Sequence, residues 1–377
     1  MVMTWIIAVL LILNACREEA RLEETGPPQI TTETILTGYD IIWGMDFLPN
    51  GDLIFGEKRG KLYQYNSTGV TEITGFPPVH AAGQGGFLDI RVHPEYSKNG
   101  WIYASYAERP AGSGARLKLI RFKITGNQVS GLETLFSTDS TNTWYGHYGS
   151  RILFGKDGYL YLSVGEGGTG SYGGPAAQNT LAQDSQSAWG KIHRLKDDGS
   201  MPADNPVIPG NTAPSSIFST GHRNQQGMAL HPATGRIWSS EHGPRGGDEI
   251  NIIGKGKNYG WPAFSEGVNY DGTNISNGHN GEGITPPVYI WTPSIGICGI
   301  AFITSETFKS WKGNLLVSGL ASQKLYRCVT DGEKITGEHV LLSNTGRIRN
   351  VVQGPDGSIY VSAENPGRII RITPVQN

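Results

Sequence analysis

Five side chains of chemically versatile types are scattered along the chain, each beside glycine or another polar residue. His147 is a candidate general base, because imidazole titrates near neutral pH. Gln84 lies in a glycine-rich run, where small neighbours let a ligand approach the backbone. Arg223, Arg347 and Arg349 carry guanidinium groups, which pair with carboxylates through two parallel hydrogen bonds. One base and three arginines suit a small anionic cofactor with several carboxylates.

A second candidate site is the segment 241–249, which reads Glu-His-Gly-Pro-Arg-Gly-Gly-Asp-Glu. Its acidic side chains and glycine carbonyls offer the oxygen ligands that a hard cation such as Ca²⁺ prefers. Simpler interpretations exist for all these features. A histidine or glutamine in a loop is usually a solvated or hydrogen-bonded polar group, and Arg347 and Arg349, on one face of a strand, could form surface ion pairs. The functional interpretation is favoured because these residues occupy equivalent places before repeated units.

The repeated unit is a glycine followed by alternating apolar residues, a turn such as Asp-Gly or Asn-Gly, and a second apolar strand. Asn-Gly and Asp-Gly between apolar runs are strong signals of a β-hairpin. Most copies continue into a third strand with basic or aromatic alternation. Six copies occur, at 44–55, 86–104, 149–162, 227–238, 299–317 and 348–361.

Six small repeated sheets predict an all-β fold, a six-bladed β-propeller with four-stranded antiparallel blades around a central channel, over residues 33–377. The segment 33–36 is expected to supply the outer strand that joins the first blade to the last. The insertions 162–226 and 255–298 are expected to be loops on one face, and 176–190 is the best helix candidate. An array of β-sandwiches is the less favoured alternative.

Composition agrees with this fold and excludes some functions. The 377 residues include 53 glycines, about twice the usual share of roughly 7%. Lys and Arg number 31 against 33 Asp and Glu, with no basic run, so nucleic acid is excluded as a partner. Cys298 and Cys328 are either two buried thiols, the favoured interpretation, or a disulfide.

The N-terminus predicts export. Residues 2–13 are almost wholly apolar but too short to span a membrane, and Cys16 follows before a charged run. We expect 1–16 to be a lipoprotein-type signal peptide with Cys16 lipidated, and 17–32 to be a flexible tether. The protein would then be periplasmic or on the cell surface, touching the membrane only through its lipid anchor. An ordinary cleaved signal peptide or a misassigned start codon is the alternative.

At this point a family resemblance is visible. The chain resembles the soluble PQQ-dependent glucose and aldose sugar dehydrogenases, the glucose/sorbosone dehydrogenase family of six-bladed propellers, over about residues 33–373. The motifs are GQGGFLDIRVHP at 83–94, HYGSRILFGKDGYLYLSVGEGG at 147–168, GHRNQQGMALHP at 221–232, EHGPRGGDEINII at 241–253, NYGWP at 258–262 and RIRNVVQGPDGSIYV at 347–361.

The resemblance implies oxidation of an aldose sugar at C1 to its lactone, with PQQ and Ca²⁺ as cofactors. His147 would take the proton of the anomeric hydroxyl while hydride passes to PQQ, and Gln84 would hold that hydroxyl. Arg223 and Asn224 would contact the quinone oxygens, and Arg347 and Arg349 would bind the PQQ carboxylates. The carbonyl groups of Gly243 and Pro244 would coordinate Ca²⁺. A second, structural Ca²⁺ would lie near Glu249 and Tyr259. Electrons would leave to an external acceptor that the sequence does not name.

Three positions depart from the family pattern. Gly146 replaces an acidic residue before the base, which predicts a less well oriented imidazole. Ala321 replaces a lysine that pairs with a PQQ carboxylate, and Lys324 lies three residues further on. The segment 293–299, Pro-Ser-Ile-Gly-Ile-Cys-Gly, also differs from the usual Pro-Ser-Ile-Ala-Pro-Ser-Gly. The alternative function is therefore a non-catalytic propeller that has lost tight PQQ binding; a metal-dependent lactonase is disfavoured because the motifs offer few carboxylates.

Overall fold

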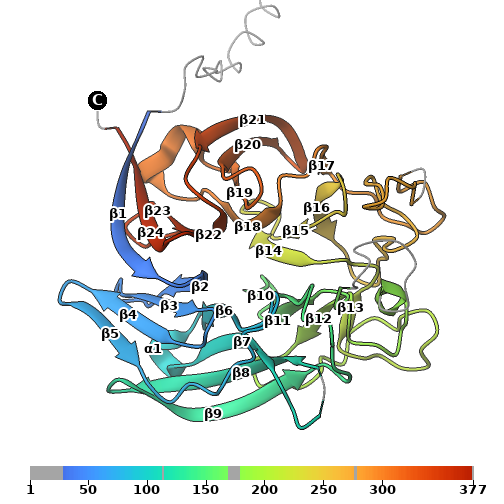
Figure 1. Cartoon of the computed structure of the whole chain (residues 1–377), viewed down its shortest axis with the longest axis horizontal. Coiled ribbons are helices and arrows are strands. Elements are labelled where there is room, and N and C mark those ends of the chain that lie inside the picture. The colour runs from blue at the N-terminus through green and yellow to red at the C-terminus, as the bar shows by residue number, and fades with distance from the viewer. Residues whose placement is uncertain (1–28, 113, 169–178, 276–277, 376–377) are drawn as a thin grey trace, which may run out of the picture.

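The computed structural model describes residues 29–112, 114–168, 179–275 and 278–375. Within them, the chain forms six four-stranded antiparallel sheets that are arranged in a ring around a common axis (Figure 1). We call the space along this axis the channel. The six-bladed β-propeller expected from the repeats is confirmed. Each repeated hairpin forms the two inner strands of one blade, because its alternating apolar residues pack against both neighbouring blades.

The strands of each blade run from the channel outwards in chain order, except in the last blade. Blades 1 to 3 contain β2 (Ile42–Phe47), β3 (Leu53–Glu57), β4 (Leu62–Asn66) and β5 (Gly69–Ile73); β6 (Phe87–Val92), β7 (Ile102–Glu108), β8 (Arg116–Thr125) and β9 (Gln128–Ser137); and β10 (Gly149–Phe154), β11 (Leu160–Val164), β12 (Lys191–Leu195) and β13 (Ile217–Ser219). Blades 4 to 6 contain β14 (Gln225–Leu230), β15 (Ile237–Glu241), β16 (Asp248–Ile253) and β17 (Tyr289–Trp291); β18 (Ile297–Phe302), β19 (Leu315–Gly319), β20 (Leu325–Asp331) and β21 (Lys334–Leu342); and β22 (Ile348–Gln353), β23 (Ile359–Ala363), β24 (Gly367–Pro374) and β1 (Ile30–Tyr39).

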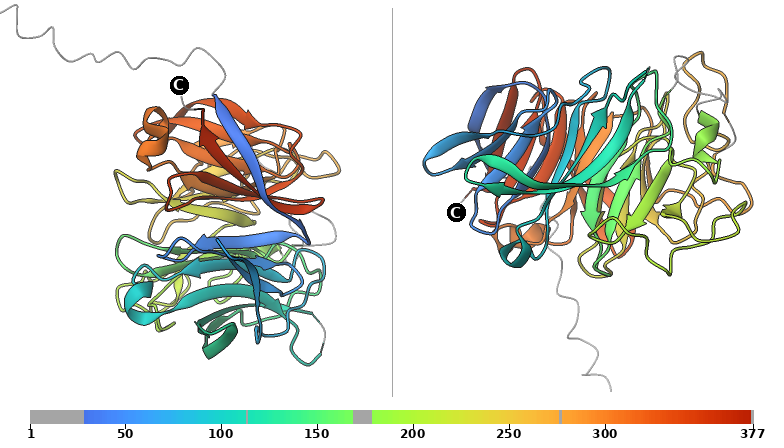
Figure 2. Two further views of the ribbon diagram at one scale, coloured as in Figure 1. Left: turned by 90° about the vertical axis from the view of Figure 1, so that its left-hand side faces the viewer. Right: turned by 90° about the horizontal axis from the view of Figure 1, so that it is seen from below.

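The ring is closed by β1, which comes first in the chain but forms the outer strand of the last blade. Ile30 lies opposite Pro374 and Tyr39 opposite Gly367, so the pairing runs along the whole of β24. Figure 2 shows the blue strand β1 lying against the red strands of blade 6. The expectation that 33–36 closes the ring is confirmed, and the strand already begins at Ile30. This arrangement leaves no unpaired strand between the first and last blades.

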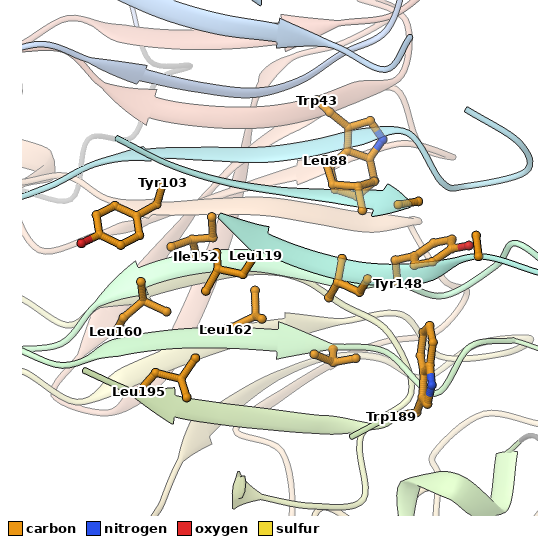
Figure 3. Packing of buried hydrophobic residues seen from close by; sticks show 14 of the residues in the cluster. Trp43, Leu88, Tyr103, Leu119, Tyr148, Ile152, Leu160, Leu162, Trp189 and Leu195 are labelled. Carbon is orange, nitrogen blue, oxygen red and sulfur yellow. The ribbon is translucent and has the colours of Figure 1, made fainter. Parts of the chain in front are cut away.

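The hydrophobic core lies between the blades. Trp43 of blade 1, Leu88 of blade 2 and Ile152 of blade 3 belong to one buried cluster (Figure 3). Neighbouring inner strands approach so closely that a Cβ atom on Gly44 would lie 2.6 Å from the backbone nitrogen of Ile90. Only glycine fits there, which explains its place at the start of the repeat.

The expected helix over 176–190 is not present in the described residues 179–190, where only the 3₁₀ turn η1 (Asn179–Ala182) forms. The Lys191 ammonium is buried in blade 3. It donates hydrogen bonds to the carbonyl oxygens of Leu181 (2.6 Å), Ala182 (3.0 Å) and Trp189 (2.7 Å). Two of these carbonyls are ones that a continuing helix would use, so the tertiary contacts override the local helix preference.

The insertions 162–226 and 255–298 were expected to be loops, but parts of both form strands. They contain the strands β12, β13 and β17, which complete blades 3 and 4. β12 was not predicted, because its sequence, Lys-Ile-His-Arg-Leu, contains three buried polar residues and so lacks the apolar alternation of a strand. Two short helical segments complete the structure, α1 (Tyr96–Asn99) and the 3₁₀ helix η2 (Glu306–Trp311). Among the described residues, no helix is long and apolar enough to cross a membrane.

The expected signal peptide 1–16, with Cys16, and most of the tether 17–32 lie outside the described residues. Cys298 and Cys328 are both buried free thiols, in agreement with the favoured interpretation.

Candidate active site

Six inner strands run in the same direction along the channel, so the residues that precede them gather at one end. Gln84 precedes β6, His147 precedes β10, Asn224 precedes β14 and Arg347 precedes β22. We call this end the channel mouth. The coincidence seen in the sequence therefore has a direct structural basis.

The imidazole of His147 is fixed by a carboxylate. Its Nδ1 lies 2.7 Å and 2.9 Å from the two carboxylate oxygens of Glu166, whose side chain is 1% exposed. Nδ1 is therefore the protonated nitrogen and donates to Glu166, which leaves Nε2 as the basic nitrogen. The structure does not bear out the expectation that Gly146 leaves the imidazole less well oriented, because the orienting carboxylate comes from the segment after β11 and not from the preceding residue.

Gln84 connects the residues around the base. Its side-chain oxygen is 3.3 Å from the backbone nitrogen of His147 and 3.4 Å from the amide nitrogen of Asn224. The Asn224 side-chain oxygen accepts in turn from the backbone nitrogen of Gly149 at 3.1 Å. The structure thus brings together the base and two amide side chains from three blades.

Arg223 extends this group toward the segment 241–249. Its Nη1 donates to the carbonyl oxygens of His242 (3.1 Å) and Gly243 (3.0 Å), and its guanidinium lies 5.1 Å from the ring centre of Trp261. The backbone nitrogen of Arg223 donates to Glu241. This places Arg223 beside one of the two carbonyl groups expected to bind Ca²⁺.

The support beneath Arg223 resembles a hydrolytic triad. His222 Nδ1 is 2.9 Å from Glu241 and its Nε2 is 2.9 Å from the Ser219 hydroxyl. Ser219 and His222 are both 0% exposed, and the ring of Tyr259 stacks on His222. A substrate has no access to this serine, so the arrangement holds the backbone of Arg223 in place.

Arg347 and Arg349 meet at a shared carboxylate, Glu364. Arg347 Nε lies 3.0 Å from one carboxylate oxygen, and Arg349 Nε lies 2.9 Å from the other. Arg349 also lies 4.7 Å from the ring centre of Trp43. The interpretation of these arginines as surface ion pairs is excluded for Arg349, which is buried.

His242 is a further residue of the site that the motifs contained but that was given no role. Burial, reinforced by the positive charge of Arg223, holds the pKa of His242 well below its usual value, so its imidazole is neutral. Its Nε2 is buried and has no hydrogen-bond partner among the described residues. A buried polar atom without a partner at such a position suits contact with a bound ligand.

Lys58 is a cation that the sequence did not reveal as a site residue. It follows β3 in blade 1, and its ammonium donates to the carbonyl oxygen of Gly83, next to Gln84, at 2.5 Å. Partial burial and repulsion from Arg349 lower the pKa of Lys58. Blade 5 lacks the expected lysine at Ala321, whereas blade 1 places a lysine near the same arginines.

The second cation site expected near Glu249 and Tyr259 stays a prediction, and the contacts of the two side chains are as follows. The Tyr259 hydroxyl donates to the carbonyl oxygen of Ile252 at 2.6 Å and is therefore already engaged. The Glu249 carboxylate instead lies 3.7 Å from His279 Nε2, and burial, followed by repulsion from Glu241, raises the pKa of Glu249 well above its usual value. In the described part of the chain, no group of three or more His, Cys, Asp or Glu side chains is arranged to hold a metal ion.

Gly243 and Pro244 lie in a buried turn after β15. The backbone nitrogen of Gly243 donates to Asp248 at 3.0 Å, which fixes the turn, and the Gly243 carbonyl oxygen faces Arg223. A carbonyl oxygen is a suitable Ca²⁺ ligand, and the metal-binding role of Gly243 stays a prediction. Pro244 is adjacent and buried, and no contact in the structure tests its role.

A cavity of about 600 Å³ opens at the opposite ends of the inner strands, far from the channel mouth. Its lining is mostly apolar, with Asp46 and Arg91 as a charged pair 3.6 Å apart. Its lining includes the imidazole of His93 and the amide of Gln353, but His93 Nδ1 accepts from the backbone nitrogen of Glu95 at 2.9 Å and is not held by a carboxylate as His147 is. The candidate active site is therefore the mouth.

A six-bladed propeller with an imidazole, amides and guanidinium groups at one channel mouth defines the class of protein. The chain belongs to the glucose/sorbosone dehydrogenase family, whose model matches residues 39–371. The resemblance seen in the motifs is thereby confirmed.

Relatives of known name support this membership. The chain is 35% identical to the aldose sugar dehydrogenase YliI of Escherichia coli, over 93% of this chain and 94% of that protein. Its structure is similar to the apo-form of the soluble aldose sugar dehydrogenase from Escherichia coli, with a TM-score of 0.86, 34% identity and coverage of 92% and 99%. It is also similar to the PQQ-bound aldose sugar dehydrogenase from Streptomyces coelicolor, with a TM-score of 0.72, 28% identity and coverage of 92% and 99%.

Proposed function

We propose that this protein is a PQQ-dependent aldose sugar dehydrogenase that oxidises the C1 hydroxyl of a sugar to the lactone. The observation that carries the proposal is the pair formed by His147 and Glu166, which lies at the mouth beside Gln84 and Asn224. The names of the similar proteins support the oxidoreductase class, and the PQQ-bound relative supports the cofactor.

Oxidation of the anomeric carbon removes a proton from oxygen and a hydride from carbon. His147 Nε2 takes the proton, since its Nδ1–H is held by Glu166 and the resulting imidazolium is stabilised by that carboxylate. Gln84 binds the same hydroxyl through its amide and so orients the O–H bond toward the base. PQQ, when bound, supplies the quinone that accepts the hydride, and Ca²⁺ polarises it as a Lewis acid.

The residues present fit an anionic quinone with several carboxylates. Arg347 offers guanidinium nitrogens at the mouth, and His242 offers a buried nitrogen without a partner among the described residues. Arg223 and Asn224 would donate to the quinone oxygens, where negative charge develops on reduction. The carbonyl oxygens of Gly243 and Pro244 would hold Ca²⁺.

The alternative, a propeller that has lost tight PQQ binding, loses one of its two supports. Glu166 orients the base in spite of Gly146. The other support, Ala321, stands, although Lys58 of blade 1 lies near enough to Arg349 to be repelled by it.

The test uses protein lacking residues 1–16, titrated with PQQ with and without Ca²⁺, while dye reduction is followed over a panel of aldoses. Calcium-dependent dye reduction with an aldose is expected. His147→Ala should lose turnover by at least about a hundredfold, the lower range of general-base contributions, while still binding PQQ. Full activity in that variant would remove His147 as the base, and absence of PQQ binding in the unmodified protein would favour the non-catalytic alternative.

We also propose that the protein is exported and lipid-anchored at Cys16, and passes electrons to an external acceptor. The apolar run 2–13 followed by Cys16 supports the anchor. Ile30 pairs with Pro374, at the end of blade 6 away from Arg347, so a tether would attach to the face opposite the mouth. The anchored protein should partition into detergent and Cys16→Ala should remain in the aqueous phase; equal partitioning would refute the anchor.

A further inference from the structure

Glu364 follows β23 and is a buried charged group at the channel mouth. Its side chain is 6% exposed, and both of its oxygens are used by arginines. One oxygen accepts from Arg349 Nε at 2.9 Å and Nη2 at 2.5 Å, and the other accepts from Arg347 Nε at 3.0 Å. One carboxylate thus holds two guanidinium groups in fixed orientations.

The two arginines are held in different ways. The Arg349 side chain is 10% exposed, and its Nη1 donates to the Gln226 side chain at 2.9 Å, so all three of its nitrogens are engaged. The Arg347 side chain is 42% exposed, and within the described residues neither of its Nη nitrogens has a hydrogen-bond partner. Arg349 is therefore part of the channel wall, and Arg347 presents its free edge to the mouth.

On the basis of the PQQ-dependent function above, we propose that Glu364 is a positioning residue that aims the Nη groups of Arg347 at a cofactor carboxylate. Arg349 locks Glu364 in place from the other side. The two arginines then have different tasks: Arg347 binds the carboxylate, and Arg349 fixes the carboxylate that orients Arg347.

The same device occurs in two other blades. Glu166 follows β11 and holds His147, which precedes β10, just as Glu364 follows β23 and holds Arg347, which precedes β22. In blade 4, Glu241 at the end of β15 holds His222, which precedes β14. A glutamate at the end of the second strand of a blade thus repeatedly orients the basic group before the first strand.

The change in PQQ affinity caused by Glu364→Gln has opposite signs for a positioning role and for simple charge balance. Replacing Glu364 with glutamine makes the mouth more positive, which by Coulomb attraction alone would tighten binding of a polyanion such as PQQ. If Glu364 positions Arg347, the same change weakens binding, because the guanidinium loses its fixed orientation.

The experiment is a titration of the whole chain with PQQ, followed by quenching of intrinsic fluorescence at low and high salt. Glu364→Gln is expected to weaken PQQ binding by about tenfold, in the range seen when a group that orients a ligand-binding residue is removed. Arg347→Gln should weaken binding by at least as much, and the double variant should be no weaker than Arg347→Gln alone, because Glu364 acts through Arg347. Glu333→Gln, which alters a carboxylate paired with Arg236 away from the mouth, is the matched control and should bind as the unmodified chain does.

Tighter or unchanged binding by Glu364→Gln would overturn the proposal, as would effects that add in the double variant. If Glu364→Gln does not fold, Glu364→Asp decides: it keeps the charge but is one methylene shorter and cannot reach both arginines. Weaker binding by Glu364→Asp supports positioning, and unchanged binding refutes it. Failure of the unmodified chain to bind PQQ would instead refute the proposed function, so the two failures are distinguishable.

Discussion

Replacement of Glu166 by glutamine tests how the base is oriented. Both oxygens of Glu166 lie within 2.9 Å of His147 Nδ1, and the carboxylate is shielded from water. A hydrogen bond to a charged group contributes about 1.5–3 kcal/mol, and about 1.4 kcal/mol corresponds to a factor of ten in rate. Because the imidazolium forms only as the proton is transferred, most of this loss is expected in the transition state. Glu166→Gln should therefore lower kcat by about 10- to 100-fold.

The assay is the initial rate of aldose-dependent dye reduction at saturating PQQ and Ca²⁺, together with a PQQ titration. PQQ affinity should stay within about twofold, since Glu166 lies on the far side of the imidazole from Nε2. Glu333→Gln is the control, because Glu333 forms an exposed ion pair with Arg236 away from the mouth. An unchanged kcat would show that the carboxylate does not assist the base. A loss of PQQ binding equal to the loss of rate would show that Glu166 maintains the pocket instead.

Two further predictions concern stability. Asp89→Ala should lower the free energy of unfolding, measured by chemical denaturation, by about 3–5 kcal/mol. The reason is that the buried Arg151 guanidinium, which lies 2.7 Å from Asp89, loses its counter-ion. A loss below about 1 kcal/mol would contradict this prediction. Burial lowers the pKa of His193 to about 4, so the unfolded chain binds a proton first as the pH falls and stability is lost between about pH 6.5 and 4, by roughly 3 kcal/mol in all. The variant His193→Gln should lose correspondingly less stability over this range, and equal losses in both proteins would refute the assignment.

The fold was predictable because its main signal is local and repeated. Each hairpin carries alternating apolar residues and a tight turn, as in 348–361, and six such units have few architectures open to them. The outer strands were harder to predict. β12 buries Lys191, His193 and Arg194, and these polar groups are satisfied by partners distant in the chain, such as the carbonyl oxygen of Leu181. A strand stabilised in this way has no apolar period to detect.

The site was predictable for the residues whose side chains gather at the channel mouth and much less so for the residues that support them. His147, Gln84 and Asn224 stood out by type and by their place before inner strands, and the structure brings them together. Glu166 and Glu364 were missed, although a signal existed. Glutamates stand at or just beyond the end of the second strand in five blades, at positions 57, 108, 166, 241 and 364.

The register of the blades explains why that position is so useful. In blade 3, Gly149 pairs with Val164, and in blade 6, Ile348 pairs with Ala363, so the residue before the first strand faces the residue after the second. A carboxylate after the second strand therefore contacts one side of the basic group that precedes the first strand of the same blade. The opposite side of that imidazole or guanidinium group faces the channel. Blade 5 ends its second strand with Gly319 and has no such carboxylate, and it is also the blade from which the expected lysine is missing. In blades 1 and 2 the glutamates have other partners: Glu57 accepts from the backbone nitrogen of Asp40 and the hydroxyl of Tyr63, and Glu108 pairs with Arg116 and Lys118. The position therefore orients a basic group in blades 3, 4 and 6, where that group precedes the first strand.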